Sequence, residues 1–350
     1  MTLRIAIVND LPIAIEALKR IVESVQRYEV AWIAKDGAEA VEMCRQDLPD
    51  LILMDMIMPV MDGIESTRQI MKETPCAILI VTASVGANAA KVFEAMGHGA
   101  LDVVKTPTLG GEGGQWGVQQ LLAKIDVIAR LIGRGRPALS KKVGTPSEEG
   151  RLASVRSLIV IGSSTGGPKA LARLLSRLPK NFPAALVIIQ HVDQHFAGGL
   201  AAWLSKQTPL DVEVAVAGTP VVEGTVLIAS TDDHLVMTPD LTLDYTSDPK
   251  EAPYRPSVDV FFESVATHWP KEGVRNSAAL LLTGMGRDGA EGMQSLWERG
   301  WHTIAEDASS CVVYGMPKAA VKMGVVKEIL PIDDIGDALI QFVEKGKDYE

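Results

Sequence analysis

In the first hundred residues, short apolar runs alternate with segments in which apolar residues recur every three or four positions. The apolar runs cover residues 4–8, 30–34, 51–54, 77–81 and 100–104. The segments between them, such as residues 13–25, 37–45 and 63–71, have the spacing of amphipathic helices. Because strands that alternate with helices form parallel sheets, the pattern predicts a five-stranded parallel sheet in an α/β domain.

Polar residues gather directly after these predicted strands. They are Asn9, Asp10, Asp55, Thr82, Lys105 and Thr106. Acids gathered at one sheet edge repel one another unless a cation lies among them. Oxygen ligands suit Mg²⁺, which would also neutralise a phosphoryl group added to Asp55. Solvated loop acids explain any one of these residues but do not readily explain their joint placement.

The apolar pattern stops between about residues 129 and 157, where Gly, Pro, Ser and charged residues dominate. This composition predicts a flexible linker. We therefore divide the chain into a first domain at 1–130, a linker at 131–155 and a second domain at 156–350. The linker's basic cluster could bind an acidic partner, but solvated charge explains it more simply because the whole chain is acidic.

The second domain begins with a strand, a glycine-rich turn and a helix. Apolar residues 158–161 lead into Gly162-Ser163-Ser164-Thr165-Gly166, and Pro168 then opens a helical pattern. The turn fits G-x-S-x-G, in which the central serine is exposed on a sharp turn beside backbone N–H groups that can stabilise an oxyanion. Ser164 is therefore a candidate nucleophile. A nucleotide-binding turn is the competing interpretation, but neither of its glycine patterns is matched, and a purely structural turn also stays open.

Two later strand ends carry partners for this serine. Residues 185–189 and 278–282 read as buried strands, and His191 and Asp288 lie beyond their ends. Sites in open α/β sheets form outside the carboxyl ends of the strands, so these residues and Ser164 could meet there. His191 would act as base and Asp288 would fix its tautomer. The chain order Ser, His, Asp differs from that of α/β-hydrolases, which indicates a different connectivity.

Whole-chain properties narrow the class of protein. The 350 residues are 47% hydrophobic, which is ample for two cores, and the net charge is −10. This charge argues against nucleic-acid binding and against anionic membranes, and no apolar run is long enough to span a bilayer. A strand pattern from Leu3 leaves no room for a signal peptide, and three scattered cysteines indicate reduced thiols, so we expect a cytoplasmic protein.

Residues 1 to about 110 resemble a response-regulator receiver domain, with Asp55 in the family's phosphoacceptor loop. The resemblance implies that Asp55 accepts phosphate, that Asp10, Asp55 and the Ile57 carbonyl bind Mg²⁺, and that Thr82 is the switch hydroxyl. Two positions depart from the family pattern. Asn9 stands where an acid is usual. Lys105 comes one residue earlier than the family's lysine. We expect the strand end to be kinked beside Pro107, so that Lys105 still reaches the phosphoryl oxygens; without a kink, the phosphate response would be weaker.

Residues 156 to 350 resemble the methylesterase domain of the CheB family of receptor protein-glutamate methylesterases. The matching motifs lie in order at residues 161–168, 189–191, 254–259, 282–289 and 312–317. The family makes Ser164, His191 and Asp288 its triad, with Thr165 and Met285 lining the site. Details of the receiver look most like the Wsp-type members of surface-sensing pathways.

This resemblance implies a phosphorylation-gated esterase that removes methyl groups from glutamates of chemoreceptors and also deamidates glutamines. It implies a CheA-type histidine kinase as phosphodonor and no cofactor for ester hydrolysis. A regulatory adaptor that binds receptors or the kinase with little turnover remains the alternative. The presence of all three catalytic residue types favours the enzyme.

Overall fold

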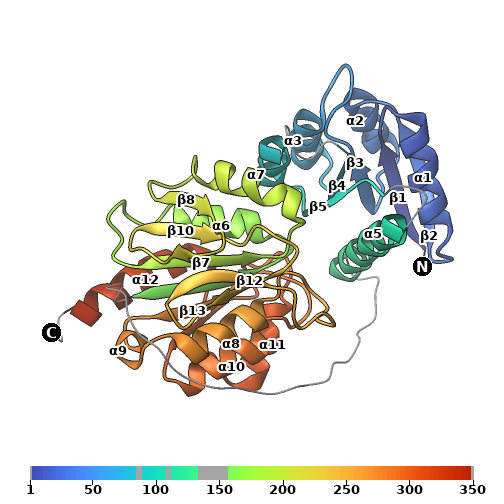
Figure 1. The fold of residues 1–350 in the computed structure, drawn as a ribbon. Helices are drawn as coiled ribbons and strands as arrows, with labels where there is room; N and C mark the ends of the chain where they lie inside the picture. The colour runs from blue at the N-terminus through green and yellow to red at the C-terminus, as the bar shows by residue number, and fades with distance from the viewer. Residues whose placement is uncertain (1, 84–88, 108–111, 133–156, 348–350) are drawn as a thin grey trace. The chain divides into compact units, whose positions relative to one another are not determined.

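The structure, a computed structural model, describes residues 2–83, 89–107, 112–132 and 157–347. The chain forms two compact units, Met1–Lys141 and Lys142–Glu350, which are described separately below (Figure 1). Residues 133–156, which contain most of the predicted linker, lie outside the described residues. None of the helices in the described ranges combines the length and the apolar composition that a membrane span requires.

The first unit contains a five-stranded parallel sheet in the order β2-β1-β3-β4-β5, as the sequence predicts. Its strands are β1 (Leu3–Val8), β2 (Tyr28–Ala34), β3 (Leu51–Met54), β4 (Ala77–Thr82) and β5 (Asp102–Lys105). Its helices are α1 (Pro12–Glu23), α2 (Gly37–Gln46), α3 (Gly63–Glu73), α4 (Ala89–His98) and α5 (Glu112–Leu131).

Local chemistry sets where two of these helices begin. Asp36 accepts hydrogen bonds from the amides of Ala38 and Glu39 at the start of α2, and Asp62 caps α3 in the same way. Alternate residues of the central strands, Ile5 and Ile7 among them, pack in one buried cluster with side chains of α1 and α5. The polar residues at the strand ends are therefore held by a rigid apolar base.

The second unit is built on a seven-stranded parallel sheet in the order β15-β14-β13-β6-β7-β10-β8. Its strands are β6 (Leu158–Ser163), β7 (Ala185–Gln190), β8 (Asp211–Val214), β10 (Thr225–Ile228), β13 (Ala278–Leu281), β14 (His302–Glu306) and β15 (Glu328–Leu330). A small antiparallel sheet of β9 (Thr219–Pro220), β11 (His234–Met237) and β12 (Thr242–Thr246) was not part of the prediction.

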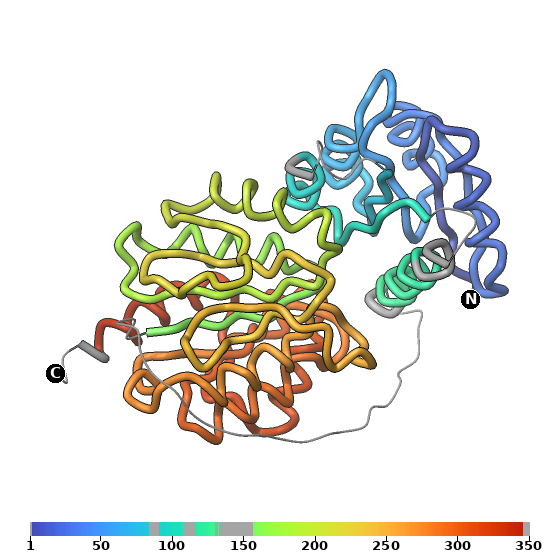
Figure 2. The backbone as a smooth tube through the Cα atoms, in the orientation of Figure 1, coloured from blue at the N-terminus to red at the C-terminus, as the bar shows by residue number. Residues whose placement is uncertain are grey.

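Helices cover both faces of the large sheet, as a doubly wound fold requires. Figures 1 and 2 show α6 (Gly167–Leu175), α7 (Gln194–Leu204) and α12 (Ile332–Lys347) on one side, and α8 (Val258–His268), α10 (Ala290–Glu298) and α11 (Met316–Met323) on the other. The short helix α9 (Lys271–Val274) follows α8. The prediction of an α/β chain with a five-stranded parallel sheet in the first domain and a doubly wound second domain is confirmed.

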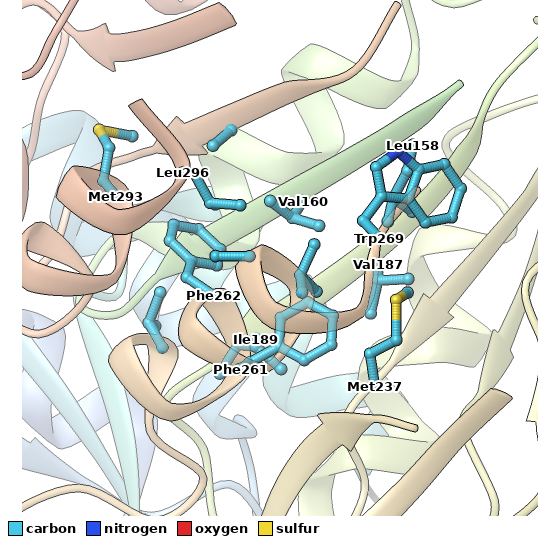
Figure 3. Close-up of a cluster of buried hydrophobic side chains, with 14 of the residues drawn as sticks. Leu158, Val160, Val187, Ile189, Met237, Phe261, Phe262, Trp269, Met293 and Leu296 are labelled. Carbon is cyan, nitrogen blue, oxygen red and sulfur yellow. The ribbon is translucent and has the colours of Figure 1, made fainter. Parts of the chain in front are cut away.

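One apolar cluster joins the strands that carry the candidate triad to the helices beneath them. Figure 3 shows Val160 of β6 among Phe261 and Phe262 of α8 and Leu296 of α10, with Leu158 of β6 in the same cluster. All five side chains are buried, and removing a buried aromatic side chain from such a core costs about 3–5 kcal/mol. The carboxyl ends of β6, β7 and β13 are thereby fixed relative to α8.

Candidate active site

Ser164 lies on the turn between β6 and α6, where the sequence predicts it. Its side chain is largely buried, with 8% of the residue exposed. Gly166 at the N-cap of α6 has a φ of 79°, a left-handed conformation that glycine adopts without strain. No side chain caps this helix start, and Pro168 occupies its first turn. The turn thus brings the nucleophile candidate to the N-terminal end of a helix, where partial positive charge favours an oxyanion.

Three adjacent strand ends bring the candidate residues into one place. Ser163 and Gln190 are paired at the ends of β6 and β7, and the His191 amide donates to the Ser163 carbonyl at 3.0 Å. On the other side, the Ser164 amide donates to the carbonyl of Thr283, which follows β13, at 3.0 Å. Ser164, His191 and the loop of Asp288 therefore meet at the carboxyl edge of the sheet, as expected for this fold class.

His191 and Asp288 are in direct contact. The ring nitrogen Nε2 of His191 lies 2.7 Å from Oδ2 of Asp288, and both side chains are buried. The other ring nitrogen, Nδ1, is buried and has no hydrogen-bond partner. A neutral ring that donates from Nε2 to the carboxylate carries its lone pair on Nδ1, so Nδ1 is the atom available as a base.

The hydrogen bond between Ser164 Oγ and His191 Nδ1 is not formed in this structure. Ser164 Oγ and Nδ1 nevertheless belong to residues on neighbouring strand ends, and catalytic hydrogen bonds often shorten only when substrate binds. The geometry therefore supports a serine nucleophile with a histidine base whose Nε2 is held by an aspartate.

The Asp288 carboxylate is held by the start of α8. The Ser257 hydroxyl donates to Oδ1 at 2.8 Å, the Val258 amide donates to Oδ2 at 2.7 Å, and the Asp259 amide donates to Oδ1 at 3.1 Å. Burial opposes ionisation, but the interaction with His191, together with the hydrogen bonds from the Val258 amide and the Ser257 hydroxyl, holds the pKa of Asp288 below its usual range. Asp288 is therefore ionised beside the imidazole.

Three supporting residues lie in the expected motifs but were given no role by the sequence. Tyr254 stacks on the His191 ring with centroids 4.4 Å apart and an interplanar angle of 5°. Gln190 accepts from the Ser163 hydroxyl and donates to the Ser164 carbonyl. Ser257 caps α8 and holds Asp288. A glutamine at the end of the apolar run 185–189 is a signal that could have been noticed, whereas the stacking of Tyr254 is visible only in three dimensions.

The two predicted site-lining residues are found on the loops around Ser164. Thr165 follows the serine and is buried, and its carbonyl accepts from the Thr283 hydroxyl at 2.9 Å. Met285 is half-buried. In the sequence it follows Gly284, which packs against Ser164, and it precedes Asp288 by three residues. Both stay candidates for lining the site. By contrast, His195 lies at the start of α7 with an exposed side chain that contacts Asp193, away from the triad contacts.

In the first unit, Asp55 follows β3 and is nearly buried. Asn9 donates from Nδ2 to Oδ2 of Asp55 at 3.0 Å, so the residue that replaces the usual acid binds the candidate phosphoacceptor. Burial raises the pKa of Asp55 and the charge of Asp10 adds to the increase, while hydrogen bonds from the Met56 amide and the Thr82 hydroxyl oppose it. Asp10 and Thr82 are therefore near Asp55, as the sequence predicts.

Lys105 is less directly placed. It is exposed at the end of β5 and in register with Thr82 on β4, so the two side chains leave the same face of the sheet. Among the described residues, no hydrogen bond or ion pair joins Lys105 to Asp55. Strand β5 stays paired with β4 up to Lys105, and Lys105 lies opposite Thr82, the expected switch residue.

The donors around Asp55 fit Mg²⁺. Asp10 and Asp55 would supply carboxylate oxygens and Ile57 would supply a carbonyl oxygen, which are the hard ligands that Mg²⁺ prefers. The mutual repulsion of the two carboxylates is the physical sign that a cation would be stabilised there. Within the described ranges, no group of three or more His, Cys, Asp or Glu side chains is arranged to hold a metal ion.

Two protein families match the chain. Residues 159–339 match the family described as CheB methylesterase, and residues 5–109 match the response regulator receiver domain. The first match lies within the second unit and contains the candidate triad, and the second lies within the first unit and contains Asp55.

Several relatives are similar to the chain over almost its full length. Protein-glutamate methylesterase/protein-glutamine glutaminase 4 of Burkholderia thailandensis is 51% identical over 345 residues, which are 99% of each chain. The enzyme of the group 3 operon of Pseudomonas putida, of the same name, is 50% identical over 343 residues, covering 98% of this chain and 100% of its own. The crystal structure of the Thermotoga maritima CheB methylesterase catalytic domain is 36% identical with a TM-score of 0.50, and the match covers 53% of this chain and 98% of that chain.

Proposed function

The chain belongs to the CheB methylesterase family and carries a response regulator receiver domain, and from this premise we propose that it is a phosphorylation-gated protein-glutamate methylesterase and protein-glutamine glutaminase. Its substrates are then γ-glutamyl methyl esters and glutamines of chemoreceptors. The observation that carries the proposal is the pair His191 Nε2 and Asp288 Oδ2 at 2.7 Å, with the base nitrogen Nδ1 left unpartnered beside the turn of Ser164.

We propose the following chemistry for the triad. Ser164 Oγ attacks the ester carbonyl while His191 Nδ1 takes the hydroxyl proton, and the carbonyl electrons move to an oxyanion near the start of α6. Collapse breaks the bond to methoxide, which takes the proton from the imidazolium and leaves as methanol. Water, deprotonated by His191, then attacks the acyl-serine carbonyl. The bond to Ser164 Oγ breaks, Oγ takes the proton back from the imidazolium, and the glutamate carboxylate is freed. A glutamine follows the same route and releases ammonia.

The environment of each residue suits its part. The ionised Asp288, which receives three donors from residues 257–259, stabilises the imidazolium that forms in both steps. Thr165 and Met285 line the acyl site in this proposal.

The proposed domain division stays 1–130, 131–155 and 156–350.

The receiver supplies the gate. In our proposal a CheA-type histidine kinase phosphorylates Asp55, with Mg²⁺ held by Asp10, Asp55 and the Ile57 carbonyl. When bound, Mg²⁺ neutralises charge on the transferred phosphoryl group. Thr82 and Lys105 then sense the phosphoryl oxygens, which the register of β4 and β5 supports. We further propose a cytoplasmic location, supported by three cysteines that are all free, and a place among Wsp-type surface-sensing pathways, supported by the receiver sequence alone.

Methanol release tests the proposal. The full chain is incubated with Mg²⁺, acetyl phosphate and receptor-containing membranes whose glutamates carry radiolabelled methyl esters. We expect the Ser164→Ala variant to release methanol more than about 10³-fold more slowly than the unsubstituted chain, because it lacks the nucleophile.

Two histidine variants provide the matched control. His191→Ala should lose activity as Ser164→Ala does. His195→Ala should release methanol at a rate within about twofold of that of the parent chain, because, among the described residues, the exposed His195 side chain makes no contact with the proposed triad. If Ser164→Ala releases methanol at nearly the rate of the parent chain and has the same melting temperature, Ser164 is not the nucleophile. A well-folded parent chain that binds receptors but releases no methanol would instead favour the regulatory adaptor.

A further inference from the structure

His234 is a buried histidine that the proposed reaction does not use. It is the first residue of β11 and has 0% of its surface exposed. Both ring nitrogens make hydrogen bonds: the Ser257 amide donates to Nδ1 at 3.1 Å, and Nε2 lies 3.1 Å from the Pro249 carbonyl oxygen. A buried polar side chain with both of its atoms engaged is held in one orientation.

These two partners define the tautomer of His234. A backbone amide can only donate, so Nδ1 must carry the lone pair, and a carbonyl can only accept, so Nε2 must carry the proton. Burial lowers the pKa of His234, and the nearby Arg255 lowers it further, against the opposing charges of Asp288 and Asp233. The ring is therefore neutral, with Nδ1 as a permanent acceptor.

Ser257, the residue that His234 holds, links this ring to the triad. Ser257 is the N-cap of α8, and its hydroxyl donates to Asp288. The next two amides, of Val258 and Asp259, donate to the same carboxylate. Residues 257–259 thus donate three hydrogen bonds to Asp288 from one hydroxyl and two amides, and His191 Nε2 makes another.

We infer that His234 is a positioning residue for the triad: its Nδ1 fixes the Ser257 backbone, and through it the helix start that aims Asp288 at His191. This inference rests on the proposed esterase function. Without an acceptor at Nδ1, the Ser257 amide would be buried and unpaired, which is costly enough to displace the segment. The consequence is a loss of imidazolium stabilisation, which lowers kcat more than it changes KM.

Two substitutions separate the roles of the ring nitrogens. In His234→Asn, the side-chain oxygen can take the position of Nδ1 and accept from Ser257, while the bond to Pro249 is lost. In His234→Gln, the amide nitrogen can take the position of Nε2 and donate to Pro249, while the acceptor for Ser257 is lost. The two variants are both uncharged amides, so they differ mainly in which hydrogen bond they keep.

We expect His234→Gln to lose about tenfold or more in kcat with KM nearly unchanged, because one buried hydrogen bond that aligns the triad is broken. His234→Asn should lose no more than about threefold. The measurement is methanol release by the phosphorylated full chain, together with the melting temperature of each variant. The low-field proton NMR signal of the His191–Asp288 hydrogen bond should shift in the Gln variant and be retained in the Asn variant.

Equal losses in the two variants, or a larger loss in His234→Asn, would overturn the inference, because a merely structural histidine does not distinguish Ser257 from Pro249. If either variant fails to fold, nitrogen NMR of the labelled parent chain decides: a proton on Nδ1 overturns the inference, and a coupling from the Ser257 amide to Nδ1 supports it. Absence of methanol release from the parent chain would refute the proposed function itself, so the two failures are distinguishable.

Discussion

Asp259 lies beside the proposed catalytic carboxylate and is held in the opposite protonation state. Burial raises the pKa of Asp259 to about 8, and the charge of Asp288 contributes to the increase. Its Oδ1 accepts from the Gly292 amide at 2.7 Å. At neutral pH, therefore, Asp288 carries the negative charge of the pair while Asp259 keeps its proton, as two carboxyl groups in one buried place require.

This protonation predicts how stability depends on pH. An unfolded aspartate loses its proton near pH 4, whereas folded Asp259 keeps it up to about pH 8. Stabilisation from this group is therefore complete below about pH 4 and is lost as the pH rises toward 8, with a slope of at most about 1.4 kcal/mol per pH unit. In Asp259→Asn, this slope should disappear, because asparagine has no proton to lose.

Urea unfolding at pH 5 and at pH 8.5, followed by tryptophan fluorescence, measures the effect. We subtract the free energy of unfolding of the parent chain from that of Asp259→Asn at each pH. This difference should be larger at pH 8.5 than at pH 5, because only the parent chain loses stability as Asp259 loses its proton. Asp244→Asn, on an exposed position of β12, is the matched control and should change little. Parallel pH profiles for the parent and the Asp259 variant would show that Asp259 is already ionised in the folded chain.

At the scale of elements, the site depends on how closely two loops approach. Gly284 follows β13, and its carbonyl accepts from the amides of Gly315 and Met316. A Cβ on Gly284 would lie 2.9 Å from Ser164 Cβ and 2.3 Å from Met316 Sδ. The nucleophile turn and the loop that carries Asp288 can therefore pack together only because residue 284 has no side chain.

Gly284→Ala should lower both stability and activity. The added methyl group must move Met316 or the turn of Ser164, and overpacking of this kind costs about 1–3 kcal/mol. We expect a lower melting temperature and a reduced kcat for methanol release. Gly198→Ala, where a Cβ meets nothing within 4 Å, is the control and should be neutral or slightly stabilising in helix α7. Indistinguishable effects of the two substitutions would contradict the close approach.

For the whole molecule, the two compact units each have their own core, and they match separate families. A receiver can gate an esterase only if phosphorylation changes the balance between two arrangements of the chain, and a ligand shifts such a balance only by its differential affinity for the two states. We propose that the unphosphorylated arrangement limits access to Ser164. The separate units make this proposal testable by truncation.

A fragment of residues 150–350 should release methanol faster than the full chain without acetyl phosphate, because the inhibiting unit is removed. Adding acetyl phosphate should accelerate the full chain and leave the fragment unchanged, since only the full chain contains Asp55. The comparison is made at equal concentrations on the same methylated membranes. A fragment no faster than the unphosphorylated full chain would argue against occlusion and for activation by direct ordering of the site.

The sequence by itself determined the features that depend on local patterns. Alternating apolar runs and helical periods specify the five strands of the first sheet and the strands β6, β7 and β13 of the second, because period and length distinguish strands from helices within a short window. The other four strands of the second sheet were not predicted. The residues at strand ends, Ser164, His191 and Asp55 among them, could be selected because polar residues after buried strands gather at one sheet edge. The family resemblance, which depends on several motifs in order, extended this to the reaction.

Only the tertiary structure decided which atoms meet. Sequence spacing cannot show that His191 presents Nε2 to Asp288, that Tyr254 stacks on the same ring, or that His234 holds Ser257, because these contacts join residues 23 to 97 positions apart. Likewise, the alignment of Lys105 with Thr82 follows from strand register, which side-chain packing across the whole sheet sets. Such contacts result from the closing of long loops around a shared core, and no local pattern encodes their geometry.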